Sequence, residues 1–140
     1  MKRFLSCMLA LLWVIMLGCA CAEFMEDPVA AAAFESRVGG FYDPSDCFIR
    51  ARYRIELPED TSQLHEQILE AYEGCGEIQL IEFGVPGIGG IVTSVFACVG
   101  TGPDGELKNL LTPMELLGRI YDESAFGLLR ITPVTPPADA

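Results

Sequence analysis

Three arginines alternate with other residues along one short segment of the chain. Arg50, Arg52 and Arg54 are separated by Ala51 and Tyr53. In a β-strand, side chains two residues apart point to the same face about 7 Å from each other, so this spacing predicts a row of three guanidinium groups. Such a row could bind the carboxylate or phosphate groups of an anionic ligand. The alternative is that the arginines form ion pairs with glutamates of a neighbouring strand.

Three cysteines are the second set of residues that could do chemistry. Cys47, Cys75 and Cys98 lie outside the N-terminal segment that holds the other three. In an oxidising compartment two of them could form a disulfide while the third stays a thiol. Their spacing fits no zinc motif, and the sequence contains no Cys-x-x-Cys. The alternative is that all three are reduced and buried as small apolar residues.

The other candidates for catalysis or metal binding are isolated in the sequence. His65 is the single histidine, and we interpret it as a surface residue because no acidic partner is fixed by its position. The turn at residues 43–46 lacks the spacing of a calcium loop. The glycines between residues 84 and 90 are followed by neither the lysine nor the helix of a phosphate loop. The sequence therefore predicts no catalytic residue, no cofactor and no metal site.

Residues 1–22 have the layout of a secretory signal peptide. A basic start precedes an apolar stretch over residues 4–17. Ala20 and Ala22 then provide the small side chains that cleavage before Glu23 requires. This pattern predicts a protein that is secreted or held in the cell envelope, outside the cytoplasm.

A lipoprotein signal is the alternative. Residues 16–19 loosely resemble the motif of bacterial lipoproteins, in which Cys19 would be lipidated and become the mature N-terminus. Met16 stands where such motifs usually have leucine, so we expect ordinary cleavage. Lipid anchoring through Cys19 stays open as the second possibility.

The mature chain is short and strongly acidic. Removal of 22 of the 140 residues leaves 118, enough for one domain with a hydrophobic core. Lys2 and Arg3 leave with the signal, so seven basic and 20 acidic residues give a net charge of −13. This charge argues against nucleic acid and against an anionic membrane surface. We expect an unidentified protein or an anionic ligand as partner, and no membrane-spanning segment after signal cleavage.

Hydrophobic periodicity predicts the secondary structure of the mature chain. Residues 47–57 alternate strictly, which predicts a strand with Ile49, Tyr53 and Ile55 buried and the arginines facing solvent. Helical spacing and the capping residues Thr61 or Ser62 and Thr112 predict two helices. The expected helices span residues 61–75 and 112–121, and the other expected strands span residues 77–85, 91–99, 106–111 and 126–134. The strand at 91–99 is apolar on both sides, so we expect it to be central.

These elements divide the chain into four parts. We expect a signal peptide at residues 1–22, a leader with a short helix at residues 23–45, an α+β domain at residues 46–134 and a disordered tail at residues 135–140. The domain is expected to be a two-layer sandwich, a mixed sheet with two helices on one face.

The topology of the sheet depends on residues 106–111. Without a strand there, the order of elements is that of a ferredoxin-like βαββαβ fold. In that fold the start of the first strand, the end of the first helix and the end of the third strand meet at one edge. Cys47 with Cys75 is then the first predicted disulfide and Cys47 with Cys98 the second.

These features together favour an exported binding or interaction domain without enzymatic activity. The export signal, the small acidic domain and the absence of a catalytic motif in the sequence support this hypothesis. A thiol-dependent redox protein or enzyme is one alternative, and a lipid-anchored structural protein of the envelope is another.

Overall fold

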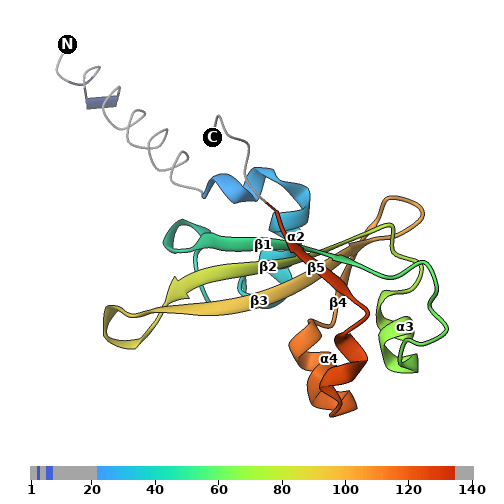
Figure 1. Cartoon of the computed structure of the whole chain (residues 1–140). Helices are drawn as coiled ribbons and strands as arrows, with labels where there is room; N and C mark the ends of the chain where they lie inside the picture. Colours follow the sequence, from blue (N-terminus) through green and yellow to red (C-terminus); the bar gives the residue numbers. More distant parts are fainter. Residues whose placement is uncertain (1–2, 4–5, 8–21, 135–140) are drawn as a thin grey trace.

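One five-stranded antiparallel sheet forms the centre of the structure, a computed structural model that describes residues 3, 6–7 and 22–134 (Figure 1). The strands are β1 (Phe48–Glu56), β2 (Glu77–Pro86), β3 (Val92–Thr101), β4 (Leu107–Leu110) and β5 (Arg130–Pro133), in the order β4-β3-β2-β1-β5. The helices are α2 (Pro28–Arg37), α3 (Glu66–Tyr72) and α4 (Pro113–Ile120). Short 3-10 turns lie at Glu23–Glu26, Pro44–Asp46, Ile88–Gly90 and Glu123–Phe126. The predicted tail, and nearly all of the predicted signal peptide, lie outside the described residues.

The predicted α+β class is confirmed, but two details of the predicted sheet are wrong. The sheet is antiparallel throughout rather than mixed, and β4 is a true strand, so the ferredoxin-like order does not occur. The pairing of β1 with β2 accounts for the difference. Ile55 at the end of β1 pairs with Ile78 at the start of β2, so β2 begins where β1 ends and runs antiparallel to it. The short helix α3 lies within the connection between these two neighbouring strand ends.

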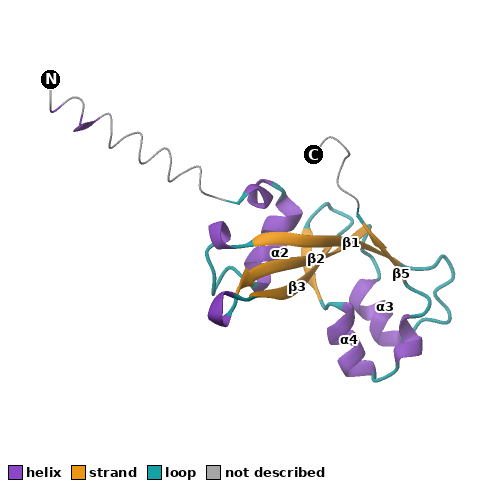
Figure 2. Ribbon diagram, turned by 60° about the vertical axis from the view of Figure 1, so that its left-hand side comes forward, coloured by secondary structure: helices purple, strands orange, loops and turns teal. Residues whose placement is uncertain are grey.

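Helices cover both faces of the sheet (Figure 2). On β2, Ile81 and Phe83 pack in one core with α2, whereas Ile78 and Leu80 pack in a second core with α3 and α4. Because alternate residues of a strand point to opposite faces, α2 lies on one face and the other two helices lie on the opposite face. The two helices predicted for one face are there, and α2 adds a third layer.

The segment predicted as a leader, residues 23–45, contributes to the core. Asp27 caps the start of α2 with its side chain. Phe34 on this helix is fully buried, and its ring centroid lies 5.3 Å from that of Phe24 and 5.6 Å from that of Phe83 on β2. The three aromatic rings therefore join the segment before β1 to the centre of the sheet.

The start of α4 agrees with the prediction, and the start of α3 does not. Thr112 accepts a hydrogen bond from the backbone N–H of Glu115 at 3.2 Å, as expected of its cap. At α3 the cap is His65, whose Nδ1 accepts from the N–H of Gln67 at 3.1 Å, rather than a residue at positions 61–62. The single histidine thus has a structural role.

The uncharged segment from Phe83 to Pro103 forms the end of β2, a tight turn and β3. The prediction that this third strand is central holds for only half of it. β4 pairs with residues 98–101, so residues 92–97 lie at the edge of the sheet. Within the described ranges, no helix has the length and apolar character needed to cross a membrane.

Candidate binding surface

A β-bulge in β1 breaks the predicted alternation. Ile49 and Ala51 pair with consecutive residues of β2, so Arg50 is an additional residue without a partner in the ladder. The bulge changes the face that the preceding side chains occupy. Ile49 packs toward α2, whereas Tyr53 and Ile55 pack in the core beneath α3 and α4. The prediction that these three residues share one buried face is therefore wrong.

The same bulge separates the three arginines. Arg52 and Arg54 lie on the face of α2, whereas Arg50 reaches toward residues on the opposite face. Each arginine also has its own carboxylate. The pairs are Arg50 with Glu82 (3.6 Å), Arg52 with Asp27 (2.6 Å) and Arg54 with Glu77 (3.6 Å). The predicted single row of guanidinium groups is thus wrong, and the arginines take part in three separate ion pairs.

The three cysteines do not meet at one edge of the sheet. Cys47 is buried in the core beneath α2, and Cys98 is buried in the core of the opposite face. Cys98 pairs through Leu80 with Tyr53, about 20 Å along β1 from Cys47. Cys75 precedes β2, and the antiparallel pairing of β2 with β1 puts it at the far end from Cys47. The predicted bridges from Cys47 are therefore wrong, and all three residues are free thiols.

Burial makes two of these thiols poor nucleophiles. Desolvation raises the pKa of Cys98 to about 12, and it also raises the pKa of Cys47. Both side chains are therefore protonated at neutral pH and act as small apolar core residues. Cys75 is only partly buried and lies against Gly100, where an added Cβ would be 2.7 Å from its sulfur.

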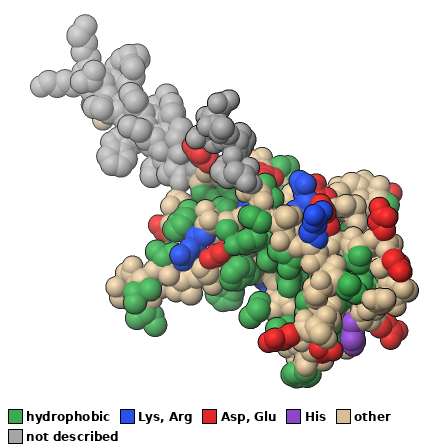
Figure 3. All heavy atoms as spheres, viewed as in Figure 1, with side chains coloured by type: hydrophobic (Ala, Val, Ile, Leu, Met, Phe, Trp, Pro, Cys, Tyr) green, Lys and Arg blue, Asp and Glu red, His purple; other side chains and the backbone are tan. Residues whose placement is uncertain are grey.

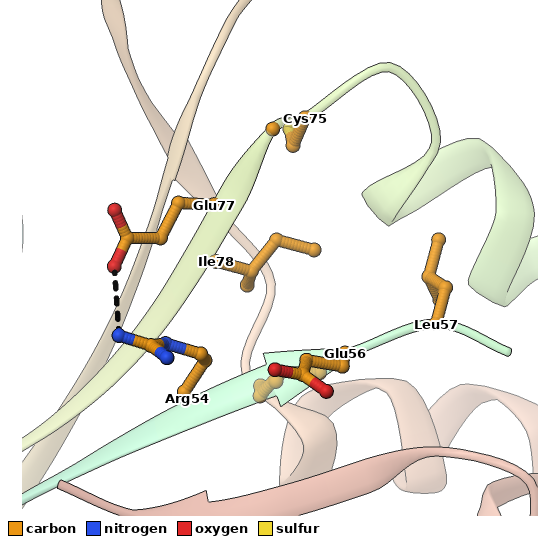
Figure 4. A pocket seen from close by; sticks show the side chains of 8 residues that line it. Arg54, Glu56, Leu57, Cys75, Glu77 and Ile78 are labelled. Atoms are coloured by element: carbon orange, nitrogen blue, oxygen red, sulfur yellow. Dashed lines mark ion pairs between the residues drawn. The ribbon is translucent and has the colours of Figure 1, made fainter.

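An open hollow of about 640 Å³ lies where β1 ends and β2 begins (Figure 4). Arg54 and Glu77 form the ion pair on one side of this hollow, and both side chains are about half exposed. Leu57 and Ile78 contribute apolar surface, and Cys75 lies nearby. Glu56 also lines the hollow, so two carboxylates and one guanidinium face it, and it has no excess of positive charge with which to bind an anionic ligand.

The end of the sheet that carries the β2–β3 hairpin is uncovered on the face of α3 and α4, since both helices lie at the other end (Figures 1 and 2). Phe48, Val92 and Phe96 on this face are 49%, 45% and 39% exposed. At the turn, Ile88 and Ile91 are 97% and 70% exposed. Figure 3 shows hydrophobic side chains at this end, at the lower left of the view. We call these five residues the hairpin surface.

The geometry of the turn does not require its isoleucines. The N–H of Gly87 donates to the carbonyl of Ile91 at 2.7 Å, and a Cβ at Gly87 would lie 2.3 Å from that oxygen. Gly89 and Gly90 have φ values of 72° and 81°, which favour glycine. Polar residues in place of Ile88 and Ile91 would suit such a turn equally well. Their apolar side chains therefore need another explanation.

Comparison of the chain with protein-family models, curated proteins and solved structures gives no match. Among the residues that the structure describes, no group of three or more His, Cys, Asp or Glu side chains is placed to hold a metal ion. Sequence reasoning missed the hairpin surface, although the uncharged run from Phe83 to Pro103 was its signal. Periodicity predicts a central strand at residues 91–99, because the pattern alone does not distinguish an edge strand from a central one.

Proposed function

We propose that the protein is an exported interaction domain without enzymatic activity, and that it contacts a partner protein through the hairpin surface. The observation that supports this most is the exposure of Ile88 and Ile91 at the tip of the hairpin. Covering apolar area is favourable by about 25 cal/mol per Å², and neighbouring exposed apolar side chains commonly mark contact sites. The strongly negative charge of the domain favours a partner with basic groups around the contact.

Export is supported by the basic start, the apolar stretch and the small residues of positions 1–22. N-terminal sequencing of the protein made in its native cell tests it. We expect the mature chain to begin at Glu23 in the extracytoplasmic fraction. A mature chain beginning at a lipidated Cys19 would replace free secretion by lipid anchoring. Full-length protein confined to the cytoplasm would contradict both forms of export.

The contact through the hairpin surface is tested with a matched pair of double variants. Ile88→Ser with Ile91→Ser removes the exposed apolar tip, and Met114→Ser with Tyr121→Ser removes two exposed apolar side chains of the α4 region instead. Equal amounts of wild type and of each double variant serve as bait, and the proteins that bind are cross-linked and captured from the same extracytoplasmic fraction. We expect at least one protein to be captured ten times less by the tip variant and unchanged by the other. Identical capture profiles for both variants would contradict the proposal.

The thiol-dependent alternative would depend on Cys75, which is the partly exposed one of the three thiols. Burial raises the pKa values of Cys47 and Cys98 and keeps both thiols protonated, which is unfavourable for exchange chemistry.

A further inference from the structure

The first half of β3 has no neighbouring strand on its outer side within residues 22–134. The hydrogen bond from the N–H of Gly87 to the carbonyl of Ile91 shows which residues of β3 form backbone hydrogen bonds with β2. Residues 91, 93, 95 and 97 therefore bond to β2. Val92, Ser94 and Phe96 direct their backbone N–H and C=O groups outward. The hydrogen bond from the N–H of Gly102 to the carbonyl of Glu106 agrees with this pattern, because the even-numbered residues of β3 then bond to β4.

This edge lacks the features that usually prevent pairing between sheets. Natural edges are protected by charged residues, proline, bulges or a covering element. At the opposite edge, β1 has the bulge and the charge of Arg50, and β5 covers its second half. The segment from Val92 to Ala97 has no charged residue, no proline and no bulge, and three of its residues are β-branched. Its composition is that of a strand suited to pairing.

We propose that two copies of the chain pair through this edge, antiparallel about a two-fold axis at Ser94, so that their sheets become continuous. The inference concerns assembly, and it stands whether or not the hairpin surface binds another protein. Extended segments add to exposed sheet edges in many complexes through main-chain hydrogen bonds. Here the added strand is the same segment of a second copy.

The free segment is complementary to itself in this arrangement. Ser94 faces its counterpart, and Val92 faces Phe96 of the second copy. Both apolar side chains are on the uncovered face, so the pairing joins them across the interface. Three hydrogen-bonded residue pairs form, with about six backbone hydrogen bonds in total. β4 begins to pair at Cys98, which limits the free edge to this length in both copies.

The charge distribution also favours contact at this edge. The chain has a formal net charge of −11, so two copies repel each other over most of their surfaces. From Phe83 to Pro103 no residue is charged. The charged groups that contact the Ser94 hydroxyl compensate each other, because Arg50 and Glu82 form an ion pair at 3.6 Å. Salt screens the remaining repulsion, so we expect added salt to strengthen the dimer.

Two substitutions of Ser94 distinguish the loss of edge pairing from the loss of the Ser94 hydroxyl. Ser94→Pro removes an N–H that points outward and makes no bond within the chain, and proline is tolerated at sheet edges. Ser94→Ala keeps this N–H, and both variants lose the hydroxyl that contacts Glu82. Sedimentation velocity over a concentration series measures the dimer. We expect wild type and Ser94→Ala to dimerise alike and Ser94→Pro to dimerise at least tenfold more weakly, with circular dichroism confirming that each variant is folded.

A cross-linking variant tests the register if Ser94→Pro does not fold. Directly opposed residues of a hydrogen-bonded pair have Cα atoms about 5.5 Å apart, within the range of a disulfide. With oxidised glutathione as oxidant, the two thiols of Ser94→Cys lose two protons and two electrons, and glutathione disulfide is reduced to two thiols. We expect covalent dimers from Ser94→Cys and not from Asp104→Cys in the exposed β3–β4 turn. Monomeric wild type at every concentration, equal dimerisation of the proline and alanine variants, or equal cross-linking of the two cysteine variants would overturn the proposal.

Discussion

The carboxylate of Asp27 binds the start of α2 and the middle of β1 at the same time. Its Oδ1 accepts from the N–H of Val29 at 3.0 Å, and its Oδ2 accepts from Nη1 of Arg52 at 2.6 Å. Burial opposes ionisation of this carboxyl, but the hydrogen bond and charge of Arg52, with the backbone N–H groups of α2, outweigh it. The pKa of Asp27 is therefore held below its ordinary value of 3.8. One side chain thus fixes the position of the helix against the sheet.

This lowered pKa gives stability with a defined pH dependence. A carboxyl whose pKa is lower in the folded state contributes stability above its unfolded pKa and loses it as the pH falls through the folded pKa. Asp27→Asn keeps a good capping residue and removes the charge, so we expect a loss of about 1 kcal/mol at pH 7 for this partly exposed pair. The difference from wild type in urea unfolding should shrink below about pH 4. A difference that does not change between pH 7 and pH 2 would contradict the role of the ion pair.

The aromatic cluster beneath α2 predicts that the segment before β1 is needed for folding. Phe34→Ala removes a fully buried ring and should cost about 3–5 kcal/mol in the free energy of unfolding. Phe41→Ala, at a side chain that is almost fully exposed, should change it by less than about 0.5 kcal/mol. Chemical denaturation of the full chain measures both. Equal small effects would mean that residues 23–45 are only a leader.

The three thiols should react at different rates. Cys75 is partly exposed, whereas desolvation raises the pKa of Cys98 to about 12 and also raises that of Cys47. With iodoacetamide at pH 8, we expect Cys75 to be labelled first and the other two only when the chain unfolds. Peptide mass mapping measures the extent of labelling at each cysteine separately. Labelling of Cys98 as fast as that of Cys75 in folded protein would show that the second core is open.

Two glycine substitutions should change stability in opposite directions. A Cβ at Gly87 would lie 2.3 Å from the backbone oxygen of Ile91, so Gly87→Ala should disrupt the hairpin and destabilise the protein by about 1–3 kcal/mol. A Cβ at Gly118 meets no atom within 4 Å, and alanine is the better helix former, so Gly118→Ala should stabilise α4 by about 0.5–1 kcal/mol. Thermal unfolding of both variants measures these changes in stability. A neutral Gly87→Ala would mean that the turn adopts another geometry.

Local features of the sequence predicted the elements well. The alternation before Pro58 identified β1, and Thr112 identified the start of α4. Both signals depend on interactions within a few residues of the chain, such as a side-chain cap or the period of a single strand. Sequence patterning is informative at that range.

The arrangement of these elements was not predictable in the same way. The bulge at Arg50 leaves the alternation of residue types unchanged and becomes visible only through the pairing with β2. The position of Cys47 relative to Cys98 depends on the antiparallel pairing of β2 with β1, which joins segments that are distant in the chain. The open edge of β3 depends on where β4 begins to pair. Each of these features is a relationship between distant segments of the chain, and hydrophobic periodicity carries no information about such relationships.

The central claim is that the edge of β3 at residues 92–96 is open and pairs with a second copy. Residue-resolved amide hydrogen exchange, measured as a function of protein concentration, tests this claim most directly. At low concentration we expect the N–H groups of Val92, Ser94 and Phe96 to exchange fast, and those of Thr93 and Val95, which bond to β2, to exchange slowly. As the concentration rises, the first three should become protected because the edge of a second copy covers them. Uniform slow exchange from 92 to 96 at the lowest concentration, or fast exchange at the three outward positions at every concentration, would contradict an edge left open for contact.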